Sequence, residues 1–114
     1  MGKIKVLAVR VRELPEVIEI ENTLEAKQKF VGGYIEMVKP YRHTDTAYII
    51  CNEEAKLLHL DPNRPLRTES GKIYDVVCGD FMVLDAPIGS DDFGGLSDKQ
   101  IEKYTEMYSE EMYI

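Results

Sequence analysis

Two arginines and an asparagine lie in or just after a proline-bounded segment, Asp61-Pro62-Asn63-Arg64-Pro65, and their side chains suit the binding of an anion. The guanidinium groups of Arg64 and Arg67 can each present a planar fork of N–H donors to a phosphate. Asn63 can pair with a base edge or a peptide group. Two prolines fix φ and hold the preceding residues extended, so we predict a stiff loop that presents Asn63 and Arg64. The alternative is a turn whose arginine pairs with a nearby carboxylate.

Two further side chains could complete such a site. Tyr34 directly follows a glycine pair and could stack on a base, although a strand tyrosine more often packs in the core. Asn52 begins the turn Asn52-Glu53-Glu54-Ala55, whose adjacent carboxylates point apart and favour a solvated turn over acid–base catalysis. The predicted ligand-binding residues are therefore Arg64, Asn63, Arg67, Tyr34 and Asn52.

The histidines and cysteines give little support for metal binding or covalent catalysis. His43 and His59 lack the short paired spacings that are typical of metal sites, and there is no phosphate-binding glycine loop. Nothing in the sequence places Cys51 or Cys78 beside a base. We therefore expect two buried free thiols, with a disulfide or redox pair as the alternative, no metal, no cofactor and no enzymatic activity.

Length and charge limit the classes of protein to consider. The chain has 114 residues, a net charge of −7 and a hydrophobic fraction of 44%, which is typical of one soluble globular domain over residues 1–114. An acidic chain without a long basic cluster is a poor direct binder of nucleic acid, but it can bind basic protein surfaces. With no apolar run of about 20 residues and no signal peptide, we expect a cytoplasmic protein without a membrane contact.

The elements that must position these residues follow from hydrophobic periodicity. We expect strands over residues 3–11, 16–21, 34–39, 47–51, 56–60 and 73–84, with a bulge or bend at Gly79. Asn22 is predicted to cap a first helix that ends at Gly32, and Ser97 with Gln100 to form the capping box of a last helix. The order β-β-α-β-β-β-β-α indicates an α+β domain, with a small mixed or mainly antiparallel sheet packed against two helices.

The last helix carries one apolar stripe, which packs either on the sheet or on a partner. Its tyrosines and methionines lead us to expect a homo-oligomer formed through this helix. The residues of the stripe are Ile101, Tyr104, Met107, Tyr108 and Met112.

Several motifs agree in order and spacing with one family. They are Asn22-Thr23-Leu24-Glu25-Ala26, Val31-Gly32-Gly33-Tyr34-Ile35-Glu36, Ile50-Cys51-Asn52-Glu53-Glu54 with Asn63-Arg64, and Tyr74-Asp75-Val76-Val77-Cys78-Gly79. Over nearly its whole length the chain resembles small proteins of unknown function that are carried mostly by phages and mobile elements of Gram-positive bacteria. It departs from their pattern at Ala55, where glycine is expected, and at Cys78, where alanine is expected.

This resemblance implies an accessory protein of a phage or mobile element in a bacterial host, and such proteins often counter host defence. Together with the Arg/Asn segment, it predicts a non-enzymatic protein that sequesters a nucleotide-like anionic immune signal. The alternative is an acidic inhibitor of a host defence or nucleic-acid-processing protein, and a small enzyme is a third option. The acidic residues available for the inhibitor are Asp85, Asp91, Asp92, Asp98, Glu102, Glu106, Glu110 and Glu111.

Overall fold

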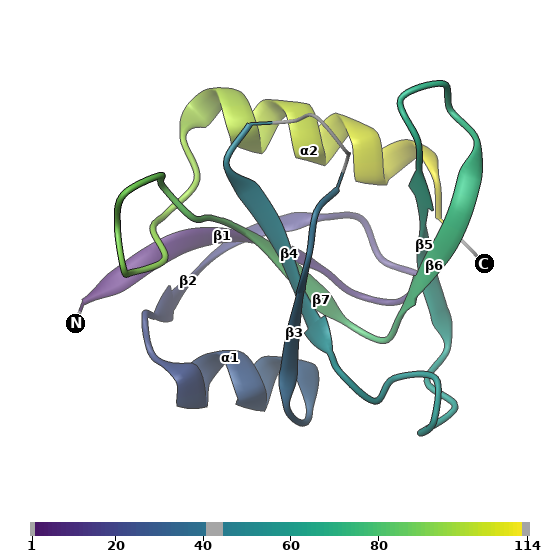
Figure 1. The fold of residues 1–114 in the computed structure, drawn as a ribbon, viewed down its shortest axis with the longest axis horizontal. Coiled ribbons are helices and arrows are strands. Elements are labelled where there is room, and N and C mark those ends of the chain that lie inside the picture. The colour runs from purple at the N-terminus through teal and green to yellow at the C-terminus, as the bar shows by residue number, and fades with distance from the viewer. Residues whose placement is uncertain (1, 41–44, 113–114) are drawn as a thin grey trace.

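A computed structural model describes residues 2–40 and 45–112 of the chain. The described residues form a five-stranded sheet, a two-stranded sheet and two helices (Figure 1). The α+β class and the expected order of strands and helices are confirmed. The elements are β1 (Lys3–Val9), β2 (Glu16–Glu21), α1 (Leu24–Val31), β3 (Ile35–Val38), β4 (Ala47–Asn52), β5 (Pro62–Arg67), β6 (Ile73–Cys78), β7 (Phe81–Asp85) and α2 (Asp98–Glu110).

The large sheet has the strand order β2-β1-β7-β4-β3, and every neighbouring pair is antiparallel. Its three central strands are apolar on both faces because both faces are covered. The edge strand β2 instead alternates exposed and half-buried residues. The strands β5 and β6 form a separate antiparallel hairpin. The sheet therefore has two edges, β2 and β3, with the hairpin outside its strand order.

Two hydrophobic clusters lie on the two faces of the sheet. One contains the helix residues Tyr104 and Tyr108 together with Leu66 and Val77 of the hairpin, so α2 and the hairpin cover this face. The other contains Val31 of α1, which lies on the opposite side (Figure 1). Most of the stripe of α2 thus packs on its own sheet, with Ile101 and Met107 partly buried, and the expected homo-oligomer through this helix stays a prediction. Neither described helix is long and apolar enough to cross a membrane.

The helix termini follow local rules, with one correction. The cap of α1 is Thr23, whose side chain accepts from the backbone N–H of Ala26. Asn22 was expected there, but its side chain donates to the carbonyl of Phe93 at 2.8 Å and accepts from the Lys27 ammonium at 2.9 Å. Gly32 ends the helix with φ of 81°, as predicted.

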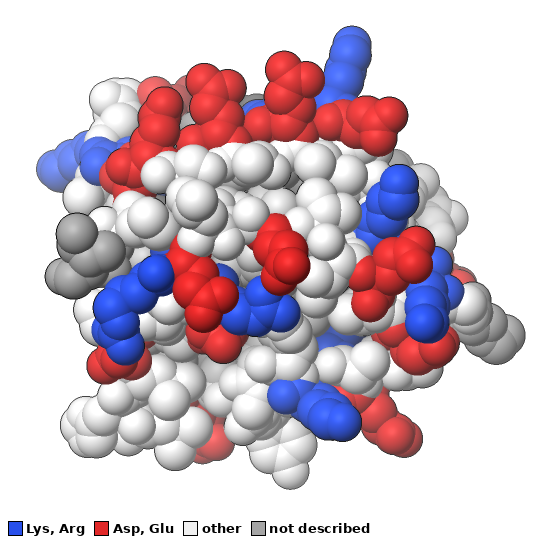
Figure 2. All heavy atoms as spheres, turned by 180° about the vertical axis from the view of Figure 1, so that it is seen from behind, with Lys and Arg blue, Asp and Glu red and all other residues white. Residues whose placement is uncertain are grey.

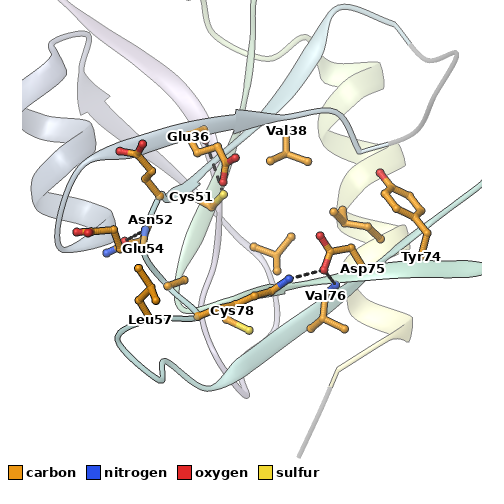
Figure 3. Close-up of a pocket in the computed structure, with 15 residues that line it drawn as sticks. Glu36, Val38, Cys51, Asn52, Glu54, Leu57, Tyr74, Asp75, Val76 and Cys78 are labelled. Carbon is orange, nitrogen blue, oxygen red and sulfur yellow. Dashed lines mark hydrogen bonds and ion pairs between the residues drawn. The ribbon is translucent and has the colours of Figure 1, made fainter.

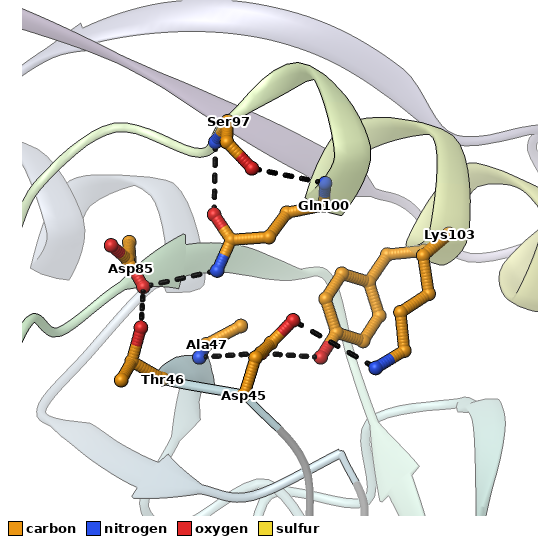
Figure 4. Close-up of polar contacts among 8 residues, drawn as sticks. Asp45, Thr46, Ala47, Asp85, Ser97, Gln100 and Lys103 are labelled. Carbon is orange, nitrogen blue, oxygen red and sulfur yellow. Dashed lines mark hydrogen bonds and ion pairs between the residues drawn. The ribbon is translucent and has the colours of Figure 1, made fainter.

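The predicted capping box of α2 is confirmed, and it belongs to a wider polar network (Figure 4). The Gln100 amide donates to Asp85 at 3.1 Å, and Asp85 also accepts from the hydroxyl of Thr46. The hydroxyl of Tyr104 donates to Asp45 at 3.0 Å. These bonds fix the first turns of α2 above the ends of β4 and β7.

The segment between β4 and β6 differs from the prediction. Residues 56–59 form turns instead of a strand, and most of the expected stiff loop, from Pro62 to Pro65, is part of strand β5. Pro62 and Pro65 each hold the preceding residue extended, and that conformation suits a strand as well as a loop. Prolines are tolerated here because, within residues 2–40 and 45–112, β5 pairs only with β6.

Residues 73–84 divide into two strands that belong to different sheets. The division lies at Gly79, whose φ of 79° is left-handed and suits glycine. A Cβ on Gly79 would also lie 2.7 Å from Cδ1 of Leu60, so the turn is closely packed. At this bend the chain leaves the hairpin and enters the centre of the large sheet.

Candidate functional site

Arg64 is fully buried, although the sequence predicted that it faces a ligand. Its Nε donates to the carbonyl of Tyr108 at 2.8 Å, and its Nη2 donates to the carbonyl of Glu13 at 2.7 Å. Its Nη1 donates to the Asn63 side chain at 2.6 Å. The cation therefore lies at the C-terminal end of α2, where unpaired carbonyls carry partial negative charge. The prediction of an exposed cationic loop is wrong, because Arg64 bonds to its own chain.

Asn63 and Arg67 are also engaged within the chain. The buried Asn63 amide donates to the carbonyls of Val9 and Gly79 at 2.8 and 2.9 Å. Arg67 forms a two-bond ion pair with Glu111, with both distances at 2.6 Å. Because Arg67 donates to it, the Glu111 carboxyl has a lowered pKa. These two residues hold the hairpin to β1 and to the end of α2.

Tyr34 and Asn52 lie together, away from the arginines. The Tyr34 side chain is 67% exposed, whereas Asn52 is buried. The Asn52 amide donates to the carbonyl of Val31 at 3.1 Å, and its oxygen accepts from the N–H of Glu54 at 2.8 Å. Both residues line a shallow cavity of about 240 Å³ next to Gly33. The five predicted residues therefore do not form one site.

A larger pocket of about 430 Å³ lies between the β3–β4 side of the large sheet and the β5–β6 hairpin (Figure 3). Cys51, Leu66 and Val77 contribute apolar surface that is continuous with the core. Glu36 lies on one side of the pocket and Asp75 on the other (Figure 3). The volume lies in the range of about 300–1,000 Å³ that is typical of small-ligand pockets.

The pocket is acidic. Four carboxylates and one ammonium line it: Glu36, Glu53, Glu54, Asp75 and Lys56. Lys56 forms an ion pair with Asp75 at 2.6 Å. This hydrogen bond raises the pKa of Lys56 and, together with the backbone N–H of Val76, lowers the pKa of Asp75. The other three carboxylates form no salt bridge in the part of the chain that the structure describes, so they favour positive charge or hydrogen-bond donors.

Two free thiols line the same pocket. Burial, reinforced by the charges of Glu36 and Asp75, raises the pKa of Cys51 to about 12. Since the thiolate is the nucleophile, Cys51 is unsuited to covalent catalysis. The free thiols are confirmed, but Cys78 is only half-buried, contrary to prediction. Residues 2–40 and 45–112 contain no cluster of ligands for a metal ion, and His43 lies outside these residues.

Comparison with known proteins assigns the chain to a family. The model of a domain of unknown function, DUF3846, matches residues 4–109. The chain belongs to this family. No curated protein and no solved structure gives a significant match. The DUF3846 match agrees with the resemblance to a family without an established activity.

Of the five predicted ligand-binding residues, Asn52 also lines this larger pocket of the DUF3846 domain, but sequence reasoning missed Glu36 and Asp75. A weak signal was present, because Glu36 is two residues from both Tyr34 and Val38. In a strand, these three side chains lie on the same face. Asp75 is a second signal, since a carboxylate stands in the middle of an otherwise apolar strand. Neither signal shows that Glu36 and Asp75 face one another, because that depends on how the hairpin packs on the sheet.

Proposed function

We propose that this DUF3846 protein is a non-enzymatic binding protein that holds an intact ligand in the pocket between the β3–β4 side of the sheet and the β5–β6 hairpin. The observation that carries this proposal is the 430 Å³ pocket itself, which combines apolar surface with several polar groups. Binding is favoured over catalysis because the Cys51 thiol, with its raised pKa, stays protonated, and the Lys56 ammonium is paired with Asp75. The resemblance described above supports a role as a phage or mobile-element accessory that counters host defence.

The ligand class needs a revision relative to the sequence prediction. A nucleotide-like anion was expected because of Arg64, Arg67 and Asn63, and these three groups are bonded within the chain. The pocket offers one ammonium and four carboxylates, so it is better suited to a neutral or cationic ligand. Sequestration of an anionic immune signal stays a prediction that a ligand panel can test.

The test is native mass spectrometry of protein purified from its host, followed by heat denaturation and analysis of the released ligand. The panel for direct titration includes cyclic and ADP-ribose-derived nucleotides, neutral nucleosides and protonated amines. Val38→Trp should fill the pocket, because Val38 is half-buried and lines it from an edge strand that tolerates an aromatic residue. Val17→Trp, on the opposite edge strand, is the matched control.

We expect the ligand to be recovered unchanged and its binding to be lost only in Val38→Trp. Recovery of a chemically altered product would show that the protein is an enzyme and would contradict the proposed binding function. Equal binding by both tryptophan variants would place the ligand elsewhere.

A second candidate function is the acidic inhibitor, and one observation favours it. Exposed carboxylates recur at every fourth residue along α2, so they form a row with a spacing of about 6 Å along the helix axis. Figure 2 shows these acidic side chains along the helix at the top of the molecule. None of them forms an ion pair with a described residue. They are Asp98, Glu102, Glu106 and Glu110.

Like charges four residues apart destabilise a helix, so the row suits a basic surface on a partner. Charge reversal at Glu102 and Glu106 should then abolish capture of a basic partner and leave the pocket ligand bound. Capture that persists after this reversal, or that does not weaken with added salt, would contradict the inhibitor.

A further inference from the structure

The pocket opens beside an unpaired strand edge. β3 is the last strand of the large sheet, and β4 is its only partner among the described residues. Glu36 and Val38 of β3 also line the pocket. An open strand edge is a template on which another extended chain can add by main-chain hydrogen bonds. The pocket and this edge are therefore adjacent parts of one surface.

The pairing of β3 with β4 shows which backbone groups face the open edge. The N–H of Glu53 donates to the carbonyl of Tyr34 at 2.9 Å. Because hydrogen-bonded pairs alternate along antiparallel strands, Glu36 then bonds to β4, while Ile35 and Met37 do not. The N–H and C=O of Ile35 and of Met37 thus point away from the sheet. These groups can pair with an added strand.

The side chains around this edge define the chemistry of the partner. The residue opposite Glu36 on an added strand would have its Cβ about 4.5–5.5 Å from that of Glu36, on the pocket face. Glu53 and Glu54 add two carboxylates in the same pocket. A lysine or arginine at the position opposite Glu36 would therefore meet an acidic surface. Among the described residues, Lys56 is the one cation that lines the pocket, and it is paired with Asp75.

Large exposed apolar side chains surround the same surface. Tyr34 lies just before the edge strand on the same face as Glu36, and Leu57 and Tyr74 line the pocket. Leu57 is 77% exposed, and Tyr74 is 52% exposed. Apolar side chains gathered beside a groove are a feature of surfaces that bind other chains. They favour a peptide segment, which covers them, over an isolated ion.

A second copy of this chain is a poor occupant of the edge. The antiparallel register in which Ile35 of one copy pairs with Met37 of the other places the two Glu36 side chains directly opposite. Like charges in that position destabilise the pair. A basic segment has the opposite effect.

We propose that an extended, basic segment of a partner protein docks on β3 as an additional strand and places a lysine or arginine at Glu36 and the pocket. This inference rests on the proposed function, because it names the ligand class of the same pocket. Affinity would come from the backbone groups of Ile35 and Met37, and selection for basic segments from the carboxylates.

The test uses a fluorescein-labelled peptide of seven residues that alternates lysine and valine, with a glutamate–valine peptide as the control. Fluorescence polarisation with the full chain should show binding of the lysine peptide alone. Met37→Pro should abolish binding, because it removes one outward N–H without removing a β3–β4 hydrogen bond. Met37→Ala, which keeps that N–H, is its matched control.

Glu36→Gln should weaken binding by about twofold to fivefold, as expected for one exposed ion pair. Glu19→Gln, on the other edge strand β2, should leave binding unchanged. If a thermal scan shows that Met37→Pro does not fold, Glu36→Lys takes its place as the test of the proposal. This variant should bind the glutamate peptide better, and the lysine peptide less well, than wild type does. Absence of lysine-peptide binding, or equal binding by Glu36→Gln and Met37→Pro, would overturn strand docking.

The two proposals fail separately. A small molecule that is recovered intact, is excluded by Val38→Trp and still binds to Met37→Pro would remove strand docking but leave the proposed function in place. A lysine peptide that binds wild type, Val38→Trp and Met37→Pro equally would remove both.

Discussion

Replacement of Arg64 by methionine should unfold this protein more readily, instead of affecting a ligand. Methionine keeps much of the buried length of the side chain but cannot donate hydrogen bonds. The carbonyl of Tyr108 and the side-chain oxygen of Asn63, which now accept from Arg64 in the interior, would lose a donor. Glu13 lies at an exposed turn, so water can replace the donor to its carbonyl.

The magnitude follows from these bonds. A hydrogen bond to a charged group contributes about 1.5–3 kcal/mol, and Arg64→Met removes two such bonds to buried acceptors. We therefore expect Arg64→Met to lower the free energy of unfolding by about 3–5 kcal/mol. For a domain of this size, about 1 kcal/mol corresponds to roughly 4 °C, so Tm should fall by about 12–20 °C.

Urea denaturation followed by circular dichroism measures this loss. The matched control is Arg67→Met, because Arg67 belongs to the same strand and its ion pair with Glu111 is about one-third exposed. That change should cost about 1 kcal/mol or less. Equal stability of the two variants would refute the assignment of Arg64 to the fold. So would a ligand that binds wild type but not folded Arg64→Met.

Three further predictions concern thiols and one turn. In native protein, an alkylating reagent should modify the half-buried Cys78 but not the buried Cys51. Mass spectrometry should therefore find one adduct per chain, and two adducts would contradict the burial of Cys51. Between pH 9 and about 12 the unfolded Cys51 ionises while the folded thiol keeps its proton, so stability should fall by up to about 4 kcal/mol. Cys51→Ala should have a shallower alkaline loss in urea denaturation, and an identical slope would exclude this titration. Gly79→Ala should lower the free energy of unfolding by about 1–3 kcal/mol, because the residue has a left-handed φ and the new Cβ would lie 2.7 Å from Leu60. Gly71→Ala is the control: its φ is also positive, but no atom lies within 4 Å of the new Cβ, so it should lose less stability in the same assay.

Local patterns predicted the elements that local physics determines. The strand over residues 16–21 was located correctly because Ile18 and Ile20 alternate with Glu19 and Glu21. The capping box at Ser97 and the stop at Gly32 depend only on residues within one turn. Such features need no knowledge of the rest of the chain.

The position of Arg64 could not be predicted in the same way. Its partners at Tyr108 and Glu13 are 44 and 51 residues away in the sequence. Proline rigidity correctly predicted an extended backbone, but it cannot distinguish a presented loop from a strand that packs on a sheet. The pocket could not be predicted for the same reason, since β3 and β6 come to line one pocket through the packing of the hairpin on the sheet.

The two strands of the hairpin are attached by bonds that respond differently to salt. The Arg64 contacts are buried, so dissolved ions screen them little. The Lys56–Asp75 pair joins side chains that are 64% and 46% exposed, and at 0.1 M ionic strength the Debye length is about 10 Å. Concentrated electrolyte should therefore weaken the Lys56–Asp75 attachment of β6, while the buried Arg64 contacts of β5 stay intact.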